Sequence, residues 1–217
     1  SVIARQAFLS ALGHPKEYAE TVKNVFRTYG KGFLGGGGHE AATKIQREIE
    51  NSPTFLFEQK SGLHFLPFEA SDKKATGIAG RAEEFVSPLI SKLPFMRPAE
   101  RSFVVPLNKQ RRDMFRSELR QWNPQFMEAL ENTTDPKLRA KIVDNFSKSK
   151  EGSKYKHLAS VLNAETGRGN LVGNSFLKYA NLALTSPRFV WSRFELPLRA
   201  IDPRTPGPVR KMLINDM

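Results

Sequence analysis

A long helix with two different faces is the strongest structural signal in this sequence. Between about residues 100 and 122, apolar side chains recur every three or four positions, which is the spacing of one face of an α-helix. Basic side chains recur at the same spacing on another side. Pro106 indicates that the helix begins only shortly before it, because proline disrupts a helix interior. The apolar stripe consists of Val104, Leu107, Phe115, Leu119 and Trp122, and the basic ridge consists of Lys109, Arg112, Arg116 and Arg120.

Helical spacing continues through most of the chain and predicts a mainly α protein, folded as an irregular multi-helix bundle. Residues 54–68 are the exception, because the alternation around Phe55 and Phe57 predicts a short extended segment or hairpin there. Further helices are expected over residues 2–12, 15–29, 40–50, 81–92 and 157–165, around residues 176–184, and after residues 136, 187 and 206.

The helix expected after Pro136 has both a start signal and a buried face. Thr134-Asp135-Pro136 places a capping carboxylate before the helix and proline in its first turn. Leu138, Ile142 and Phe146 are spaced to face the core. Residues 148–156 are polar and mostly basic, and we expect them to form a link to the next helix.

Charge divides the chain into two regions. Residues 1–100 carry 13 Lys and Arg against 11 Asp and Glu, whereas residues 101–217 carry 21 against 11. Most of the net charge of +12 therefore belongs to the second region. We expect an N-terminal helical region over residues 1–95, with a glycine-rich loop and an extended arm, and a basic helical region over residues 96–217. The first residue, Ser1, suggests a piece of a longer chain. The basic excess favours polyanionic partners such as nucleic acid.

The residue types that usually carry catalysis or bind metals form no recognisable pattern. Cysteine is absent, which excludes disulfides, thiolate metal ligands and cysteine nucleophiles. The four histidines, at positions 14, 39, 64 and 157, lie far apart, and none stands in a metal-ligand spacing. These residues therefore give no indication of a metal site or of a nucleophile motif, and we expect no metal or cofactor. We also expect no membrane span, because no apolar stretch approaches the ~20 residues needed to cross a bilayer.

Two glycine-rich stretches leave open an anion-binding alternative. Residues 35–38 precede a helix, whose first amides could hold an anion, but no P-loop Lys-Ser/Thr follows, and a flexible connector is favoured. Gly167-Arg168-Gly169 could hold a phosphate through Arg168 and nearby amides. Glycines in such positions more often end a helix, and we favour that interpretation.

Cations and aromatic rings interleave over residues 188–194, as they do in proteins that bind single-stranded nucleic acid. Together with the basic ridge, this pattern predicts contact with nucleic acid or an acidic partner. The alternatives are a solvated basic face and core aromatics flanked by arginines. The predicted contact residues are Lys109, Arg112, Arg116, Arg120, Arg168, Arg188 and Arg193, and the predicted packing or interface residues are Phe115, Trp122, Phe189, Trp191 and Phe194.

Three runs of sequence resemble a known family. They are ERSFVVPLNKQRRDMF (residues 100–115), LNAETGRGNL (residues 162–171) and NLALTSPRFVWSRFELP (residues 181–197). In this order they resemble the C-terminal portion of large polyvalent proteins encoded by tailed bacteriophages and conjugative elements. The stretches ARQAFL and QKSGLHF fit the upstream part of the same pattern. One departure is that Ala183-Leu184-Thr185 stands where the family usually has two phenylalanines.

The resemblance implies a role in virus assembly and delivery. Such polyproteins resemble cargo that is carried inside the capsid and delivered with the genome, with enzymatic modules elsewhere in the same polypeptide. The expectation is a non-enzymatic structural and delivery module of an internal virion protein, found in the virion interior and then in the host cell. Its expected partners are other virion proteins or the rest of its own polyprotein, and DNA, and an oligomer is an open alternative. The rival expectation is an intracellular nucleic-acid-binding or nucleic-acid-processing module of a mobile-element polyprotein.

Overall fold

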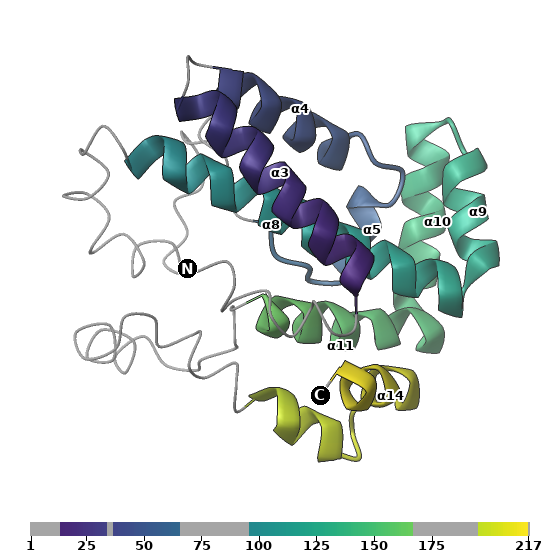
Figure 1. Ribbon diagram of the computed structural model, residues 1–217. Coiled ribbons are helices and arrows are strands. Elements are labelled where there is room, and N and C mark those ends of the chain that lie inside the picture. Colours follow the sequence, from purple (N-terminus) through teal and green to yellow (C-terminus); the bar gives the residue numbers. More distant parts are fainter. Residues whose placement is uncertain (1–13, 34–36, 66–95, 167–194, 217) are drawn as a thin grey trace, which may run out of the picture.

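Helices account for all regular secondary structure in the residues that the computed structural model describes, namely 14–33, 37–65, 96–166 and 195–216 (Figure 1). The prediction of a mainly α, multi-helix bundle is confirmed. The helices are α3 (Pro15–Phe33), α4 (Gly37–Glu50), α5 (Phe55–Lys60), α8 (Met96–Trp122), α9 (Pro124–Asn132), α10 (Pro136–Lys148), α11 (Lys150–Glu165) and α14 (Gly207–Asp216), together with helical residues 195–201.

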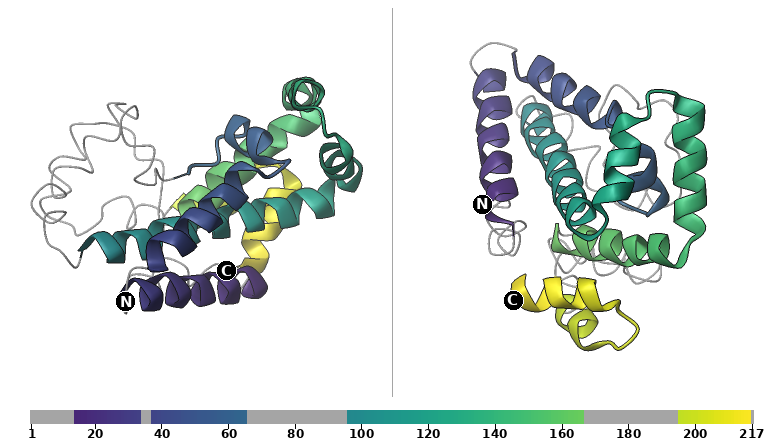
Figure 2. Two further views of the ribbon diagram at one scale, coloured as in Figure 1. Left: turned by 90° about the horizontal axis from the view of Figure 1, so that it is seen from above. Right: turned by 90° about the vertical axis from the view of Figure 1, so that its right-hand side faces the viewer.

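Helix α8 runs through the middle of the molecule, and the other helices pack around it. Helices α3 and α4 contact each other, and both contact α8. In the right-hand view of Figure 2, α3 lies on one side of α8, while α9 and α10 lie on the other. Helix α11 also contacts α8, and α14 packs against α11. The regions predicted over residues 1–95 and 96–217 therefore pack against each other wherever both are described.

The main hydrophobic core gathers aromatic rings around the fully buried Phe57. Its ring centroid lies 5.0 Å from that of Phe126, 5.3 Å from Tyr155, 5.5 Å from Phe146 and 5.8 Å from Phe115, each in an edge-on arrangement. Edge-to-face ring pairs stabilise a core beyond the burial of their area. The rings come from α5, α8, α9, α10 and α11, so one residue of the short helix α5 joins four other helices.

The extended segment predicted near residues 54–68 is wrong in its first half, because Phe55–Lys60 forms helix α5. The chain then continues without regular structure to residue 65, and the rest of the predicted segment lies outside the described residues. Alternation of Phe55 and Phe57 resembles a strand, but the burial of Phe57 among four other rings outweighs a weak local preference. Gly62, with a φ of 85°, follows the helix and turns the chain.

The chain turns sharply between α10 and α11, where a link was predicted over residues 148–156. That prediction is wrong, because α11 begins at Lys150. Ser149 supplies the reason: its side-chain oxygen accepts a hydrogen bond from the backbone N–H of Gly152 at 2.9 Å. This cap satisfies a free amide at the start of the helix, so a polar sequence forms the first turns of α11.

Two details of α8 and α10 also differ from expectation. Pro106 lies well inside α8 and not near its start. It is buried, and it leaves the helix without one backbone hydrogen bond because proline has no N–H to donate. On α10, Leu138 is 51% exposed while Val143 is fully buried, so the buried face is rotated from the predicted one. Ile142 and Phe146 are partly buried and pack against the core, as expected.

Replacing Gly152 with alanine should destabilise the corner between α10 and α11. A Cβ at this position would lie 2.0 Å from the backbone oxygen of Phe146, and a helix backbone cannot move aside as the end of a flexible side chain can. We expect the free energy of unfolding, measured with urea, to fall by about 1–3 kcal/mol. Gly207→Ala is the control, because a Cβ at position 207 meets nothing within 4 Å. Equal stabilities of the two variants would contradict this packing.

Candidate functional site

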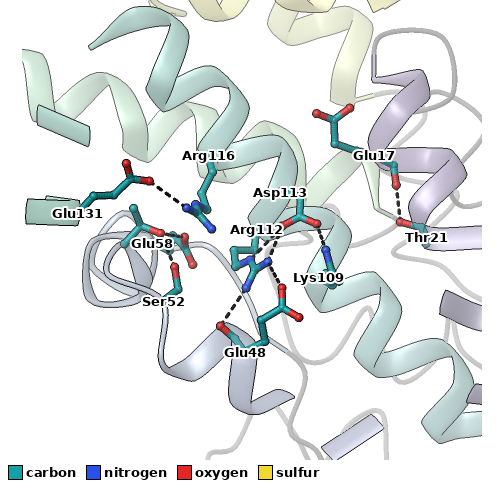
Figure 3. A network of polar contacts seen from close by, with 11 residues as sticks. Glu17, Thr21, Glu48, Ser52, Glu58, Lys109, Arg112, Asp113, Arg116 and Glu131 are labelled. Atoms are coloured by element: carbon teal, nitrogen blue, oxygen red, sulfur yellow. Dashed lines mark hydrogen bonds and ion pairs between the residues drawn. The ribbon is translucent and has the colours of Figure 1, made fainter. Parts of the chain in front are cut away.

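A polar network crosses the middle of α8 and joins it to α4 and α9 (Figure 3). Its centre is Arg112, whose side chain is only 3% exposed. Its Nη1 donates to the backbone oxygen of Glu48 at 3.0 Å and its Nη2 to the carboxylate of Glu48 at 3.1 Å. Glu48 lies in the last turn of α4, where carbonyl groups lack partners within the helix. Arg112 therefore fastens the end of α4 to α8.

Asp113 balances the charge of two members of the basic ridge. Its carboxylate accepts from Nη2 of Arg112 at 2.8 Å and from Nζ of Lys109 at 2.5 Å. Burial alone would lower the pKa of Arg112, but Asp113 and then Glu48 outweigh it and raise that pKa above its ordinary value. Lys109 and Arg112 are thus engaged within the fold, which corrects the alternative of a solvated face for this half of the ridge.

The other half of the ridge reaches the surface. Arg116 and Arg120 both donate to one carboxylate oxygen of Glu131 on α9, at 3.3 and 3.2 Å. Their side chains are 24% and 64% exposed. Exposed ion pairs of this kind contribute little stability, so these guanidinium groups can exchange Glu131 for another anion at low cost.

A surface hollow of about 440 Å³ lies beside these two arginines. Two of the side chains that line it are carboxylates, Glu17 and Asp113, and their negative charge opposes the binding of a phosphate inside it. The hollow therefore offers mixed charge and not a clear anion site. Its lining consists of Glu17, Asp113, Arg116, Ser117, Arg120 and Gln121.

Arg111 is a buried arginine of α8 that was not among the residues predicted from the sequence. It is 1% exposed, and its Nε donates to the side-chain oxygen of Thr166 at 2.5 Å. Its two other nitrogens donate to the backbone oxygen of His64 at 3.1 Å and to that of Thr166 at 3.3 Å. Thr166 is the C-cap of α11, so the guanidinium group binds a hydroxyl and a carbonyl group at this helix end. A signal existed, because position 111 lies four residues from both Leu107 and Phe115 on the apolar stripe.

Glu58 on α5 is a buried carboxyl group at the edge of this network. It is fully buried, and its Oε1 accepts a hydrogen bond from the hydroxyl of Thr54 at 2.5 Å. Burial raises the pKa of Glu58 to about 7, although the hydrogen bond from Thr54 and the charges of Arg112 and Arg116 act to lower it. The position of the group beneath α8 thus makes its protonation sensitive to pH near neutrality.

The remaining predicted residues fall into two groups. Phe115 is fully buried and Trp122 is partly buried against the same core, so both pack within the chain and not at an exposed interface. Of the glycine-rich stretch near residue 167, only the preceding Thr166 is described. The residues that lie outside the described ranges are Arg168, Arg188, Phe189, Trp191, Arg193 and Phe194.

Comparison with known proteins gives no match: no protein-family model, curated protein or solved structure matches the chain. The resemblance to phage polyvalent proteins therefore stays a prediction that rests on three runs of sequence. None of the helices in the described part of the chain combines the length and apolar character that a bilayer crossing requires. Among the same residues, no three His, Asp or Glu side chains come together in a way that could hold a metal ion.

Glu58→Gln should change how stability depends on pH. The pKa of Glu58 is raised from 4.5 to about 7 in the folded state, so the folded state holds this proton more tightly than the unfolded state does. The resulting contribution to the free energy of unfolding is fully present below pH 4.5 and is lost as the pH rises through 7. Glutamine cannot ionise, so the variant should not lose this contribution. Between those pH values its free energy of unfolding should rise relative to that of the wild type by on the order of 3 kcal/mol. Urea unfolding at several pH values measures this difference.

Glu128→Gln, at an exposed position on α9, controls for the loss of one negative charge. Parallel pH profiles for the wild type and Glu58→Gln would rule out ionisation of a buried Glu58 near neutral pH.

Proposed function

We propose that this chain is a non-enzymatic structural and delivery module of an internal virion protein, carried in the capsid of a tailed bacteriophage and ejected with its genome. The module packs against other virion proteins or the rest of its own polyprotein, and it contacts DNA through a basic helical surface. Support for this class of protein comes from the order of the three runs that resemble polyvalent proteins.

The contact between Arg111 and Thr166 carries the structural part of the proposal. Arg111 stands in the run over residues 100–115 and Thr166 in the run over residues 162–171, and the two side chains meet at 2.5 Å in the interior. A site for catalysis would present such groups to a substrate. Here both are buried and hydrogen-bonded to each other, which is the expected use of motif residues in a structural module.

Exposed apolar side chains supply surface for protein partners. Three of them lie close in sequence on the C-terminal helices: Leu198 is 56% exposed, Ile201 is 76% exposed and Ile214 is 58% exposed. Phe26 on α3 is a fourth, at 73%. An apolar side chain that stays exposed is available to a protein partner, which is compatible with a module that packs against virion components.

Mass spectrometry of purified virions of the phage that encodes the chain tests this proposal. We expect peptides from the described helices to be abundant in virions and to disappear from the particles after the genome is ejected. The rival function, an intracellular nucleic-acid-binding module, requires the reverse distribution. Peptides found in infected cells but absent from virions would overturn the proposal.

A further inference from the structure

Three lysines form a line on the outer side of α10. Lys137, Lys141 and Lys148 are separated by four and seven residues, which places them on one face of the helix, and all three are exposed. Val143, which is fully buried, marks the opposite face. At 1.5 Å per residue the line is about 16 Å long. In the right-hand view of Figure 2, α10 lies at the outer edge of the molecule, away from α3.

The surroundings leave this face strongly positive. The acidic side chain of the same face, Asp144, is paired with Lys60 from α5. The hydrogen bond from Lys60 and the charges of Lys60 and Lys148 lower the pKa of Asp144. No ion pair engages Lys137, Lys141 or Lys148 within the described residues, in contrast to Lys109 and Arg112 on α8. The face thus combines three lysines without an ion pair and one carboxylate that Lys60 already neutralises.

We propose that the α10 lysine face, formed by Lys137, Lys141 and Lys148, binds the phosphate backbone of double-stranded DNA without reading its sequence. The inference deepens the proposed function, on which it rests, by moving the DNA contact from the α8 ridge to α10. A row of ammonium groups matches a row of phosphates, because each lysine can neutralise one of them and release its counterion.

DNA fits this face better than an anionic membrane does. A helix that binds a membrane surface inserts its apolar side among the lipids. The apolar side of α10 is occupied instead, since Val143, Ile142 and Phe146 all pack against the core of the protein. One apolar side chain of α10, Leu138, is exposed, but the three exposed lysines lie in a line, which suits the regular charge of a nucleic-acid backbone.

The test measures the affinity of the full chain for a 20-base-pair DNA duplex of arbitrary sequence by fluorescence anisotropy over a series of salt concentrations. A plot of log affinity against log salt has a negative slope, and its magnitude decreases by about 0.9 for each phosphate contact that is lost. We expect the triple variant Lys137→Gln, Lys141→Gln, Lys148→Gln to lower the magnitude of this slope by about 2 to 3. Its thermal unfolding midpoint should match that of the wild type, because these lysines are exposed and unpaired in the described structure.

The chain offers a closely matched control on α3. Lys16, Lys23 and Arg27 are also exposed, and they line one face of a helix over the same number of residues. Glu17 and Glu20 lie among them on α3, so that face is less positive. The triple glutamine variant of α3 removes the same charge and should change the slope by less than about 1.

The outcomes separate the two proposals. Equal losses from the α3 and α10 variants would mean that binding follows total charge, which would overturn the α10 assignment while leaving DNA contact in place. If the wild type binds no duplex, the DNA contact of the proposed function fails together with this inference. Binding to vesicles that contain an anionic lipid, without binding to duplex, would assign the face to a membrane surface instead.

Discussion

Two neighbouring buried arginines on α8, which bind different parts of the chain, join the helices of this fold. Arg111 and Arg112 are 1% and 3% exposed on the central helix α8, and a buried guanidinium group must find hydrogen-bond acceptors because it cannot lose its charge. Arg112 finds them at the end of α4 and on Asp113, and Arg111 finds them at the end of α11. Each helix end supplies carbonyl groups that lack partners within the helix. These contacts thus supply hydrogen-bond acceptors to both arginines and donors to the two helix ends. They also fix the positions of α4 and α11 against α8.

This arrangement separates the cations of the chain into two kinds. Lys109, Arg111 and Arg112 act inside the bundle, where removing a partner would leave an uncompensated charge. The lysines of α10 lie outside it and remain available to a partner. The carboxyl group of Glu58 is also internal, and burial raises its pKa despite two nearby arginines. Within the described residues, cations close together in sequence therefore differ in whether they face the interior or the solvent.

The sequence predicts those features that depend on neighbours along the chain. The apolar stripe identifies α8, and Asp135 identifies the start of α10, where its carboxylate does accept a hydrogen bond from the N–H of Lys137 at 2.9 Å. Features that depend on residues far apart in the chain cannot be predicted from the sequence in this way. Helix α5 forms because Phe57 joins a core made by four other helices. The ridge arginine Arg112 looks exposed by spacing, because its partner Glu48 lies 64 residues away.

The candidate site shows the same limit. The position of Arg111 identifies it as a cation on an apolar stripe. Nothing in the neighbouring sequence indicates that Thr166, 55 residues later, ends a helix beside it. Lysine and arginine side chains can form ion pairs within the fold or remain exposed as a binding surface. Which of the two occurs depends on the carboxylates that the fold places near them. Only the packed structure therefore distinguishes the α8 ridge from the α10 face.

A double-mutant cycle between Arg111 and Thr166 tests the central claim most directly. The free energy of unfolding would be measured for the wild type, Arg111→Met, Thr166→Val and the double variant. If this buried contact joins the two parts of the chain, the double variant should lose less stability than the sum of the single losses, by about 1–3 kcal/mol. Strictly additive losses would contradict the claim that the fold depends on this contact.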